Sequence, residues 1–260
     1  IVLVRSATTV RKEVIDACPG LKLIGRGGVG MDNIDVAYAR ENGRTVINTP
    51  ASSSQSVAEL VMGHLFAGAR SLHHSFKHME SSDFSALKKR YAKGTELRGK
   101  TLLIVGFGRI GQSLASYALG CGMHVKAVNL TPCTVDISLG EIQGIGEIKV
   151  PITATSDLQA VIGEAGYISF HVPKKADGRA GIGGEEFELM KKGVAFVNAA
   201  RGGVIDEDAL LAAIASGKVA FAGLDVFENE PNPRKDLLNN DNIATTPHVG
   251  AATVEAQDRI

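Results

Sequence analysis

Along most of the chain, short continuous apolar runs alternate with segments whose apolar residues recur at helical spacing. The alternation is regular from Thr101 onward, where each apolar run predicts a buried strand. These predicted strands cover residues 102–105, 125–128, 167–171, 194–197 and 220–224. Predicted helices lie between and after them at residues 110–119, 157–162, 185–190 and 207–215. Such a pattern indicates a parallel sheet covered by helices on both faces.

The first 50 residues show the same pattern on a smaller scale. Strands are predicted at residues 1–4, 21–24 and 45–47, and a helix at residues 10–18 ends at Pro19-Gly20. Ser56 and Glu59 have the spacing of a capping box, which predicts a long helix from Ser56 to about residue 79. The polar, basic stretch at residues 81–100 is weakly patterned and predicts a loop.

This pattern predicts a doubly wound α/β nucleotide-binding domain preceded by part of a smaller α/β domain. The chain opens inside an apolar run, Ile1-Val2-Leu3-Val4, and has no initiator Met. Near its other end, Thr253 could cap a helix that meets no Gly or Pro stop signal. We therefore expect both ends to be cut.

Composition narrows the class of protein. The 260 residues carry 28 Lys and Arg against 28 Asp and Glu, a balance that argues against a nucleic-acid binder driven by bulk positive charge. No window approaches the roughly 18 apolar residues of a membrane span. Three cysteines without a C-x-x-C pair favour neither a disulfide framework nor a zinc site, and a reducing cytoplasm is the simplest expectation. The 30 glycines are typical of tight strand-to-helix turns.

A glycine-rich turn follows the predicted strand at 102–105 directly. Gly106 permits the tight turn, Gly108 allows close approach of a pyrophosphate, and Gly111 lets the helix pack near the strand. A merely structural βα turn is the alternative reading. The acid expected at the end of the second strand is replaced by Asn129, whose amide can bond a ribose hydroxyl but does not repel a 2′-phosphate. We therefore expect NAD as cofactor, with NADP not excluded.

Three polar segments follow later strands. They begin at Asn198, Asp225 and Thr246, and they supply Arg201, Glu230 and His248 respectively. Ligand and catalytic groups of open parallel sheets lie beyond the carboxyl ends of the strands. An arginine clamps a carboxylate, a histidine moves a hydroxyl proton, and a carboxylate beside the histidine fixes its tautomer. Taken singly, such an arginine or glutamate is more often a surface charge and such a histidine more often structural, but together they are typical of 2-hydroxy acid chemistry.

These segments resemble the D-isomer-specific 2-hydroxyacid dehydrogenases, and most closely the phosphoglycerate dehydrogenases of serine biosynthesis. The resemblance spans nearly the whole chain in order. It is carried by V-R-S-A-T-T-V (4–10), I-G-R-G-G-V-G-M-D-N-I-D (24–35), N-T-P (48–50), S-V-A-E-L (56–60), G-F-G-R-I-G (106–111), N-A-A-R-G-G-V-I-D-E (198–207), D-V-F-E-N-E-P (225–231) and T-P-H-V-G-A-A-T (246–253).

The resemblance implies a role for each matched residue. Arg201 binds substrate, His248 is the acid/base and Glu230 is its partner. The implied cofactor-binding residues are Gly106, Gly108, Arg109, Ile110, Gly111, Asn129, Val29, Val172, Ala199, Ala200, Asp225 and Gly250. It also implies a Rossmann NAD-binding domain at residues 55–247 and a partial, flavodoxin-like substrate domain at residues 1–54 and 248–260. Asn129 departs from the family's usual Asp.

The expected substrate is D-3-phosphoglycerate, oxidised to 3-phosphohydroxypyruvate. Arg5 and Arg26 lie in segments similar to those that contact the phosphate, and the N–H groups of Gly27, Gly28 and Val29 could form a nest for the carboxylate. The helix from Ser56 implies a homodimer or homotetramer. Alternatives are a glyoxylate/hydroxypyruvate reductase, another D-2-hydroxyacid dehydrogenase, or an NAD(H)-binding co-repressor. No metal site is expected, although His74 and His78 have i, i+4 spacing.

Overall fold

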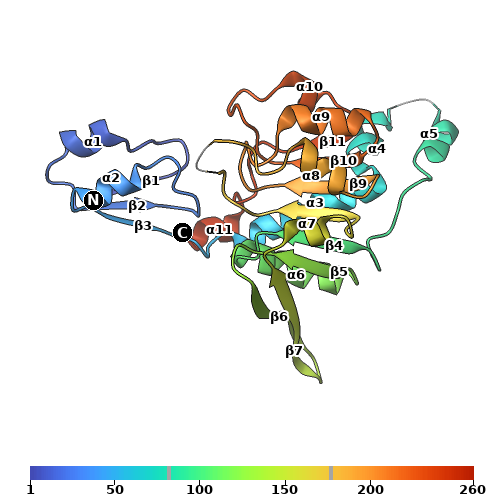
Figure 1. The fold of residues 1–260 in the computed structure, drawn as a ribbon, viewed down its shortest axis with the longest axis horizontal. Coiled ribbons are helices and arrows are strands. Elements are labelled where there is room, and N and C mark those ends of the chain that lie inside the picture. Colours follow the sequence, from blue (N-terminus) through green and yellow to red (C-terminus); the bar gives the residue numbers. More distant parts are fainter. Residues whose placement is uncertain (81–82, 176–177) are drawn as a thin grey trace. The chain divides into compact units, whose positions relative to one another are not determined.

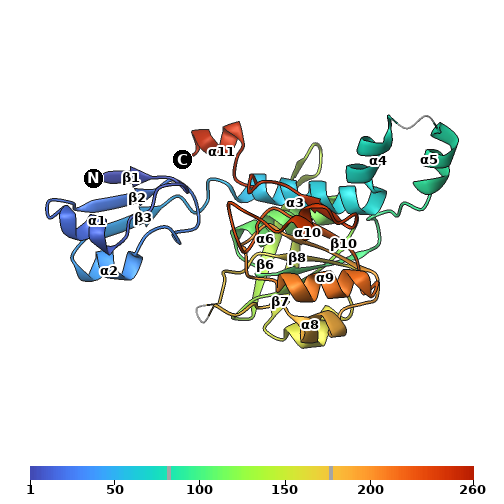
Figure 2. The same ribbon diagram turned by 90° about the horizontal axis from the view of Figure 1, so that it is seen from above.

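A computed structural model describes residues 1–80, 83–175 and 178–260, and the chain divides into two units. The first unit comprises residues 1–56 and 251–260, and the second comprises residues 57–250. Each has its own sheet and its own hydrophobic core, and the ribbon is drawn in Figures 1 and 2.

The first unit is a small α/β unit built on a three-stranded parallel sheet in the order β1-β2-β3. Its elements are β1 (Val2–Val4), α1 (Lys12–Ala17), β2 (Leu23–Arg26), α2 (Val36–Glu41), β3 (Thr45–Asn48) and α11 (Val254–Asp258). Val10, Ile15, Ile24 and Val46 form part of its core. The predicted cap of the last helix is confirmed, because the Thr253 side chain accepts a hydrogen bond from the Ala256 N–H at 3.1 Å.

The second unit contains an eight-stranded sheet in the order β11-β10-β9-β8-β4-β5-β7-β6. Its strands are β4 (Thr101–Val105), β5 (His124–Val128), β6 (Cys133–Ile142), β7 (Gly146–Thr155), β8 (Tyr167–Phe170), β9 (Val194–Asn198), β10 (Val219–Leu224) and β11 (Ile243–Thr245). Pairing is parallel throughout except between β6 and β7. The doubly wound α/β class predicted from the sequence is confirmed.

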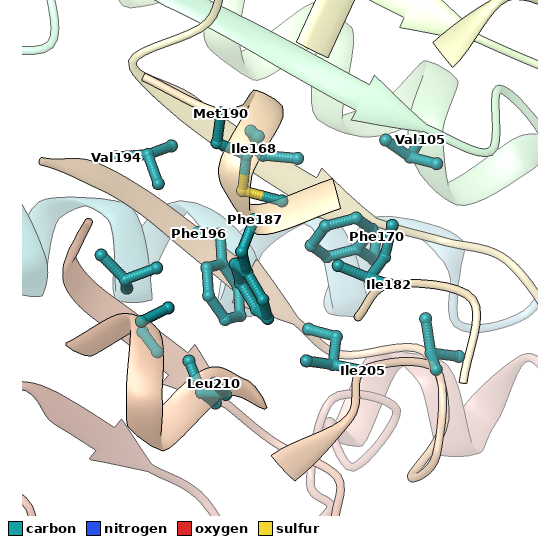
Figure 3. Packing of buried hydrophobic residues seen from close by; sticks show 14 of the residues in the cluster. Val105, Ile168, Phe170, Ile182, Phe187, Met190, Val194, Phe196, Ile205 and Leu210 are labelled. Atoms are coloured by element: carbon teal, nitrogen blue, oxygen red, sulfur yellow. The ribbon is translucent and has the colours of Figure 1, made fainter. Parts of the chain in front are cut away.

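Helices cover both faces of this sheet, as Figure 2 shows for α3 on one side and α8 and α9 on the other. The helices that follow one another in this unit are α3 (Ser54–Arg70), α4 (Leu72–His78), α5 (Phe84–Arg90), α6 (Arg109–Gly120), α7 (Leu158–Ile162), α8 (Gly184–Leu189), α9 (Glu207–Ala215) and α10 (Lys235–Leu238). On the α8–α9 face, Phe170, Phe187 and Phe196 pack together in the core shown in Figure 3. Because helices cover both faces of the sheet, the side chains on both faces of each strand are buried, which explains why the strands are continuously apolar.

A β-hairpin stands where the alternating pattern led us to expect only a connection. β6 and β7 run antiparallel from Cys133 to Thr155, and β7 joins the sheet beside β5. Ile137 and Ile152 are buried from this hairpin, and its turn uses two glycines with positive φ, Gly144 and Gly146. These two strands were not predicted, because their alternation of apolar and polar residues differs from the continuous apolar runs of the central sheet.

Two helix predictions are corrected. The predicted long helix begins at Ser54 rather than after Ser56, and it ends at Arg70 because Ser71 takes a left-handed conformation with φ of 51°. The hydroxyl of Ser56 lies 2.8 Å from that of Thr253, so Ser56 is not the cap. The stretch at residues 81–100 was predicted as a loop but contains the helix α5, which Asp83 caps by accepting the Ala86 N–H at 2.8 Å. Residues 81–82 lie outside the described part.

In the described part of the chain, no helix combines the length and the apolar character that crossing a membrane requires.

Candidate active site

The register of the parallel strands places six strand ends along one edge of the large sheet. Val105 pairs with Val128 and Phe170, and the alignment continues across the sheet through Asn198, Leu224 and Thr245. The residues that follow these strands therefore share that edge, and they include Gly106, Asn129, Val172, Ala199, Asp225 and Thr246. All three polar segments singled out in the sequence begin here.

The glycine turn has the backbone geometry that a dinucleotide requires. Gly106 has φ of +100°, and a Cβ there would lie 2.5 Å from the carbonyl oxygen of His171. A Cβ on Gly111 would lie 2.4 Å from the Gly106 oxygen, so only glycine lets α6 start this close to the strand. Gly108 faces open space, with nothing within 4 Å of a Cβ. The exposed N-terminus of α6 thus fits a pyrophosphate, with Arg109 and Ile110 in its first turn.

Two other residues expected at the cofactor lie around this turn. Val172 follows β8 and reaches the turn, since its Cγ1 would be 3.1 Å from a Cβ on Gly106. Asn129 follows β5 and donates from its amide nitrogen to the carbonyl oxygen of Thr131 at 3.1 Å. That bond orients the amide and leaves its oxygen as the acceptor suited to a ribose hydroxyl.

The loop after β9 is held by Asn198. Its side-chain oxygen accepts the Ala200 N–H at 3.1 Å, and its amide donates to the Arg201 carbonyl at the same distance. Arg201 itself donates from Nη1 to the Ala200 oxygen at 2.6 Å, which fixes the plane of its guanidinium group. Within this loop, Ala199 is partly buried and Ala200 is buried.

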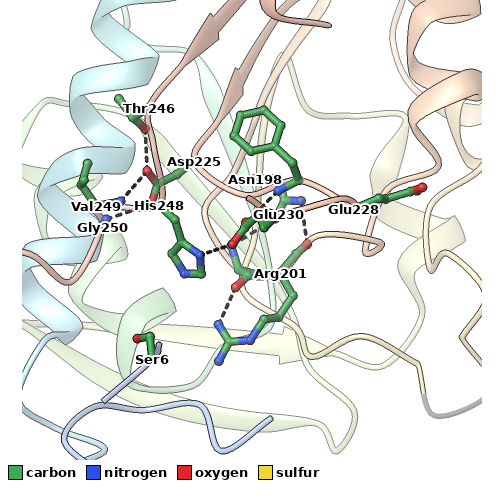
Figure 4. Close-up of polar contacts among 12 residues, drawn as sticks. Ser6, Asn198, Arg201, Asp225, Glu228, Glu230, Thr246, His248, Val249 and Gly250 are labelled. Atoms are coloured by element: carbon green, nitrogen blue, oxygen red, sulfur yellow. Dashed lines mark hydrogen bonds and ion pairs between the residues drawn. The ribbon is translucent and has the colours of Figure 1, made fainter. Parts of the chain in front are cut away.

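His248 and Glu230, from two different strand-end loops, are brought into contact. Nδ1 of His248 lies 2.7 Å from Oε2 of Glu230, and the two side chains point toward one another in Figure 4. The other Glu230 oxygen accepts the Phe227 N–H at 3.0 Å, so the carboxylate is itself oriented. An Nδ1–H···carboxylate bond leaves Nε2 of the ring as the nitrogen that can exchange a proton with a ligand.

Asp225 is buried and accepts three hydrogen bonds from the segment that carries His248. Oδ1 accepts the Thr246 hydroxyl at 2.6 Å and the Val249 N–H at 2.9 Å, and Oδ2 accepts the Gly250 N–H at 2.8 Å. His248 lies between these anchors with φ of 52°, in the left-handed region. The loop is thus wrapped around one carboxylate.

In the first unit, Arg5 directly follows β1, and Arg26 is the last residue of β2. Val4, the last residue of β1, pairs with Arg26, so the two arginines lie at the same end of neighbouring parallel strands. Arg26 donates to the Ser6 hydroxyl at 2.9 Å and to the Gly27 carbonyl at 2.8 Å, and Arg5 contacts Gln257. The two cationic side chains therefore lie at one edge of this small sheet.

The predicted three-amide nest at Gly27, Gly28 and Val29 is corrected. Gly27 donates its N–H to the Val4 carbonyl at 3.0 Å, and Gly28 donates to the Thr49 hydroxyl at 2.8 Å. Two of the three N–H groups therefore already have protein acceptors. The glycines let the chain turn closely beneath the Arg26 guanidinium, because a Cβ on Gly28 would collide with it.

Sequence reasoning missed several polar residues that support this edge. Glu207 is 6% exposed, its carboxylate accepts the Glu228 N–H at 2.9 Å, and burial raises its pKa. His171 lies beside the glycine turn, and burial lowers its pKa to about 4. His64 of α3 is also buried. The sequence does hold one signal of such residues, which is a polar residue at a position where the helix or strand pattern expects an apolar one. That signal does not reveal which residue, distant in the sequence, is its hydrogen-bond partner.

In the described residues, no group of three His, Cys, Asp or Glu side chains is arranged to hold a metal ion.

Comparisons with known proteins place the chain in a family. The sequence profile described as "D-isomer specific 2-hydroxyacid dehydrogenase, NAD binding domain" matches residues 62–250. The chain is 43% identical over 263 residues to a hydroxypyruvate reductase of Thermotoga maritima, covering all of this chain and 80% of that protein. It is also 43% identical over 258 residues to a D-3-phosphoglycerate dehydrogenase of Methanocaldococcus jannaschii, covering 99% of this chain. The chain spans about half of that protein, 47% of its length.

A solved structure extends the likeness to the fold. An NADPH-dependent glyoxylate/hydroxypyruvate reductase of Sinorhizobium meliloti, in complex with NADP and malonate, matches with a TM-score of 0.81 at 28% identity. The match covers 99% of this chain and 76% of that one. With a matching profile over most of the chain and these relatives, the chain belongs to the D-isomer-specific 2-hydroxyacid dehydrogenase family and contains its NAD-binding domain.

Proposed function

We propose that this protein uses NAD to oxidise D-3-phosphoglycerate to 3-phosphohydroxypyruvate, the entry step of serine biosynthesis. The observation that carries the catalytic part is the 2.7 Å contact of His248 with Glu230, on the same edge as the Arg201 loop and the glycine turn. These groups come from separate strand ends, and the combination is what a 2-hydroxy acid dehydrogenation needs.

Each side chain has a distinct task in this proposal. Nε2 of His248 takes the proton of the C2 hydroxyl, and Glu230 stabilises the imidazolium that results. Arg201 binds the substrate carboxylate and the oxygen that becomes the carbonyl. NAD, when bound, supplies the acceptor for the hydride that leaves C2. The ring needs apolar walls, which we assign to Val29, Val172 and Ala199, and Asp225 is assigned to the carboxamide.

The choice of a phosphorylated substrate rests on the first unit, which we propose is the substrate domain. Arg5 and Arg26 lie at adjacent strand ends of this unit, and two neighbouring cations of this kind suit a phosphate group. The relatives named as D-3-phosphoglycerate dehydrogenases support the same choice.

A second candidate function is the reduction of hydroxypyruvate or glyoxylate. The same side chains would serve, with the proton and the hydride moving in the opposite direction. It is favoured by the Thermotoga maritima relative, because the chain covers 80% of that protein. A panel of phosphoglycerate, glycerate, hydroxypyruvate and glyoxylate with both cofactors, followed by nicotinamide absorbance, separates the candidates. Turnover of phosphoglycerate with a kcat/KM at least tenfold above that of glycerate supports the first. The absence of any turnover by the full-length protein would support the co-repressor class instead.

Arg26→Ala tests the phosphate assignment directly. It should raise KM for phosphoglycerate by at least tenfold while changing KM for an unphosphorylated hydroxy acid by less than threefold, because only the former loses an ion pair. Arg40→Ala removes the same charge from an exposed position of α2 and serves as the control. Equal effects of Arg26→Ala on both substrates would refute the assignment.

We also propose that the protein is at least a homodimer and acts in the cytoplasm. Neither α4 nor α5 contains a buried residue. Each nevertheless carries a large apolar side chain: Phe76 of α4 is 72% exposed, and Phe84 of α5 is 65% exposed. Exposed apolar side chains of this kind favour an interface, and we propose that a second copy of the chain buries them. Replacing both with Asp should convert the sedimenting species to a monomer, whereas an unchanged mass would disprove this interface.

The proposed cytoplasmic location agrees with the cysteines. The three cysteines are free thiols, as a reducing compartment allows.

A further inference from the structure

A buried histidine on α3 lies next to the strand-end edge without being part of the chemistry described above. His64 is 5% exposed, and it fits against Gly223 of β10, where a Cβ would lie 2.8 Å from the histidine's Cβ and Cγ. Glycine at 223 is what leaves room for the imidazole. Burial lowers the pKa of His64, because the enclosed surroundings disfavour the charged ring.

The hydrogen bonds of His64 have a defined direction. Its Nε2 lies 3.1 Å from Oγ1 of Thr246, and the Thr246 hydroxyl lies 2.6 Å from Oδ1 of Asp225. A hydroxyl has one proton, and a carboxylate only accepts, so that proton points to Asp225. The Thr246 oxygen must then accept from His64, which assigns the Nε2–H tautomer to this ring.

This chain of bonds ends on the loop that carries His248. Asp225 also accepts the N–H groups of Val249 and Gly250, so its bonds fall on both sides of His248 in the sequence. Figure 4 shows the carboxylate of Asp225 among these partners. The left-handed backbone of His248 persists because the surrounding contacts impose it.

We propose that His64 is a positioning residue, which orients the Thr246 hydroxyl toward Asp225 and thereby holds the His248 loop in its working conformation. The inference rests on the proposed function only for the consequence in catalysis. Without the donor at 64, the Thr246 oxygen loses the bond that fixes its position, its hydroxyl is held less tightly against Asp225, and the His248 ring moves relative to Glu230.

The test compares substitutions that differ in donor capacity. His64→Met keeps apolar bulk but removes the donor, and His64→Gln keeps an N–H near the position of Nε2. We expect His64→Met to lower kcat at least tenfold with KM within threefold of wild type, and His64→Gln to recover most of that loss. His73→Met, on α4, is the control for replacing a histidine of the same helical region.

A second readout is independent of turnover. The Cε1–H resonance of His248, assigned by its absence in His248→Ala, should shift in His64→Met and return toward the wild-type value in His64→Gln. If the protein catalysed none of the proposed reactions, this spectrum would still decide the positioning role. Wild-type kcat and an unmoved resonance in a folded His64→Met protein would overturn the inference, as would equal losses in the Met and Gln variants.

Should His64→Met fail to fold, Thr246 provides the same comparison from the other end of the bond. Thr246→Ser retains the hydroxyl and should keep the His248 resonance in place, whereas Thr246→Val removes the hydroxyl and should shift it. Identical spectra for the Ser and Val variants would contradict the proposal. Thermal melting of each variant separates loss of fold from loss of position.

Discussion

Gly202 and Phe227 bring the backbones of two strand-end loops into direct contact. A Cβ on Gly202 would lie 1.8 Å from the carbonyl oxygen of Phe227 and 2.9 Å from the amide nitrogen of Glu228. Gly202 follows Arg201, and Phe227 donates its N–H to Glu230. The arginine loop and the carboxylate that holds His248 are therefore spaced by a glycine.

Gly202→Ala should force these loops apart. We expect the free energy of unfolding to fall by about 1–3 kcal/mol, as overpacking generally costs, and kcat to fall at least tenfold because Arg201 and Glu230 separate. Urea unfolding and steady-state kinetics measure the two effects. Gly184→Ala, where a Cβ meets nothing within 4 Å, is the matched control. A Gly202→Ala protein with wild-type kcat would show that the spacing is unimportant.

Removal of the histidine should separate chemistry from cofactor binding. His248→Ala is expected to lower kcat by about 10²–10⁴-fold through loss of the acid/base, while the Kd for NADH, followed by fluorescence, stays within threefold. Glu230→Gln should also lower kcat, because an amide does not stabilise the imidazolium as a carboxylate does. Substantial turnover by His248→Ala would exclude the assigned role.

Asn129 should determine how strongly the site distinguishes the two nicotinamide cofactors. A carboxylate there would bond the ribose hydroxyls of NAD and repel a 2′-phosphate. Asn129→Asp is thus expected to raise the ratio of the Kd for NADPH to that for NADH by about tenfold, which corresponds to about 1.4 kcal/mol. Asn239→Asp adds the same charge at an exposed position after α10. Equal changes in both variants would assign the effect to overall charge.

The buried His171 predicts a loss of stability in mild acid. Burial lowers its pKa to about 4, whereas a histidine in the unfolded chain has a pKa near 6.5. Between these values the unfolded state binds a proton that the folded state refuses, so the stabilisation is complete above pH 6.5 and declines as the pH falls toward 4. From pH 7 to pH 5 the decline should be about 2 kcal/mol.

Urea unfolding of His171→Gln at both pH values checks this expectation. The variant should show a smaller difference between pH 7 and pH 5 than the wild-type protein, since its side chain does not titrate. His124→Gln, which replaces an exposed histidine, should leave the difference unchanged. An undiminished pH dependence in His171→Gln would assign the acid sensitivity to other groups.

The class of fold and the candidate residues follow from the amino-acid sequence, because both depend on local patterns. Apolar runs such as 194–197 specify strands buried on both faces, and a glycine turn after a strand specifies where a helix can start near a diphosphate. The cap predicted at Thr253 follows the same local logic and is confirmed, because Thr253 accepts the Ala256 N–H; Asp206 caps α9 in the same way by accepting the Ala209 N–H.

Which of these residues meet depends on how the whole chain folds. Glu230 and His248 are 18 positions apart, and His64 is 182 positions from Thr246, so no periodicity links them. Their contacts arise from strand register and helix packing, which bring distant segments to one sheet edge. The same reason applies to the β6–β7 hairpin and to the occupied amides of Gly27 and Gly28, since hydrogen-bond partners are chosen by the folded chain as a whole.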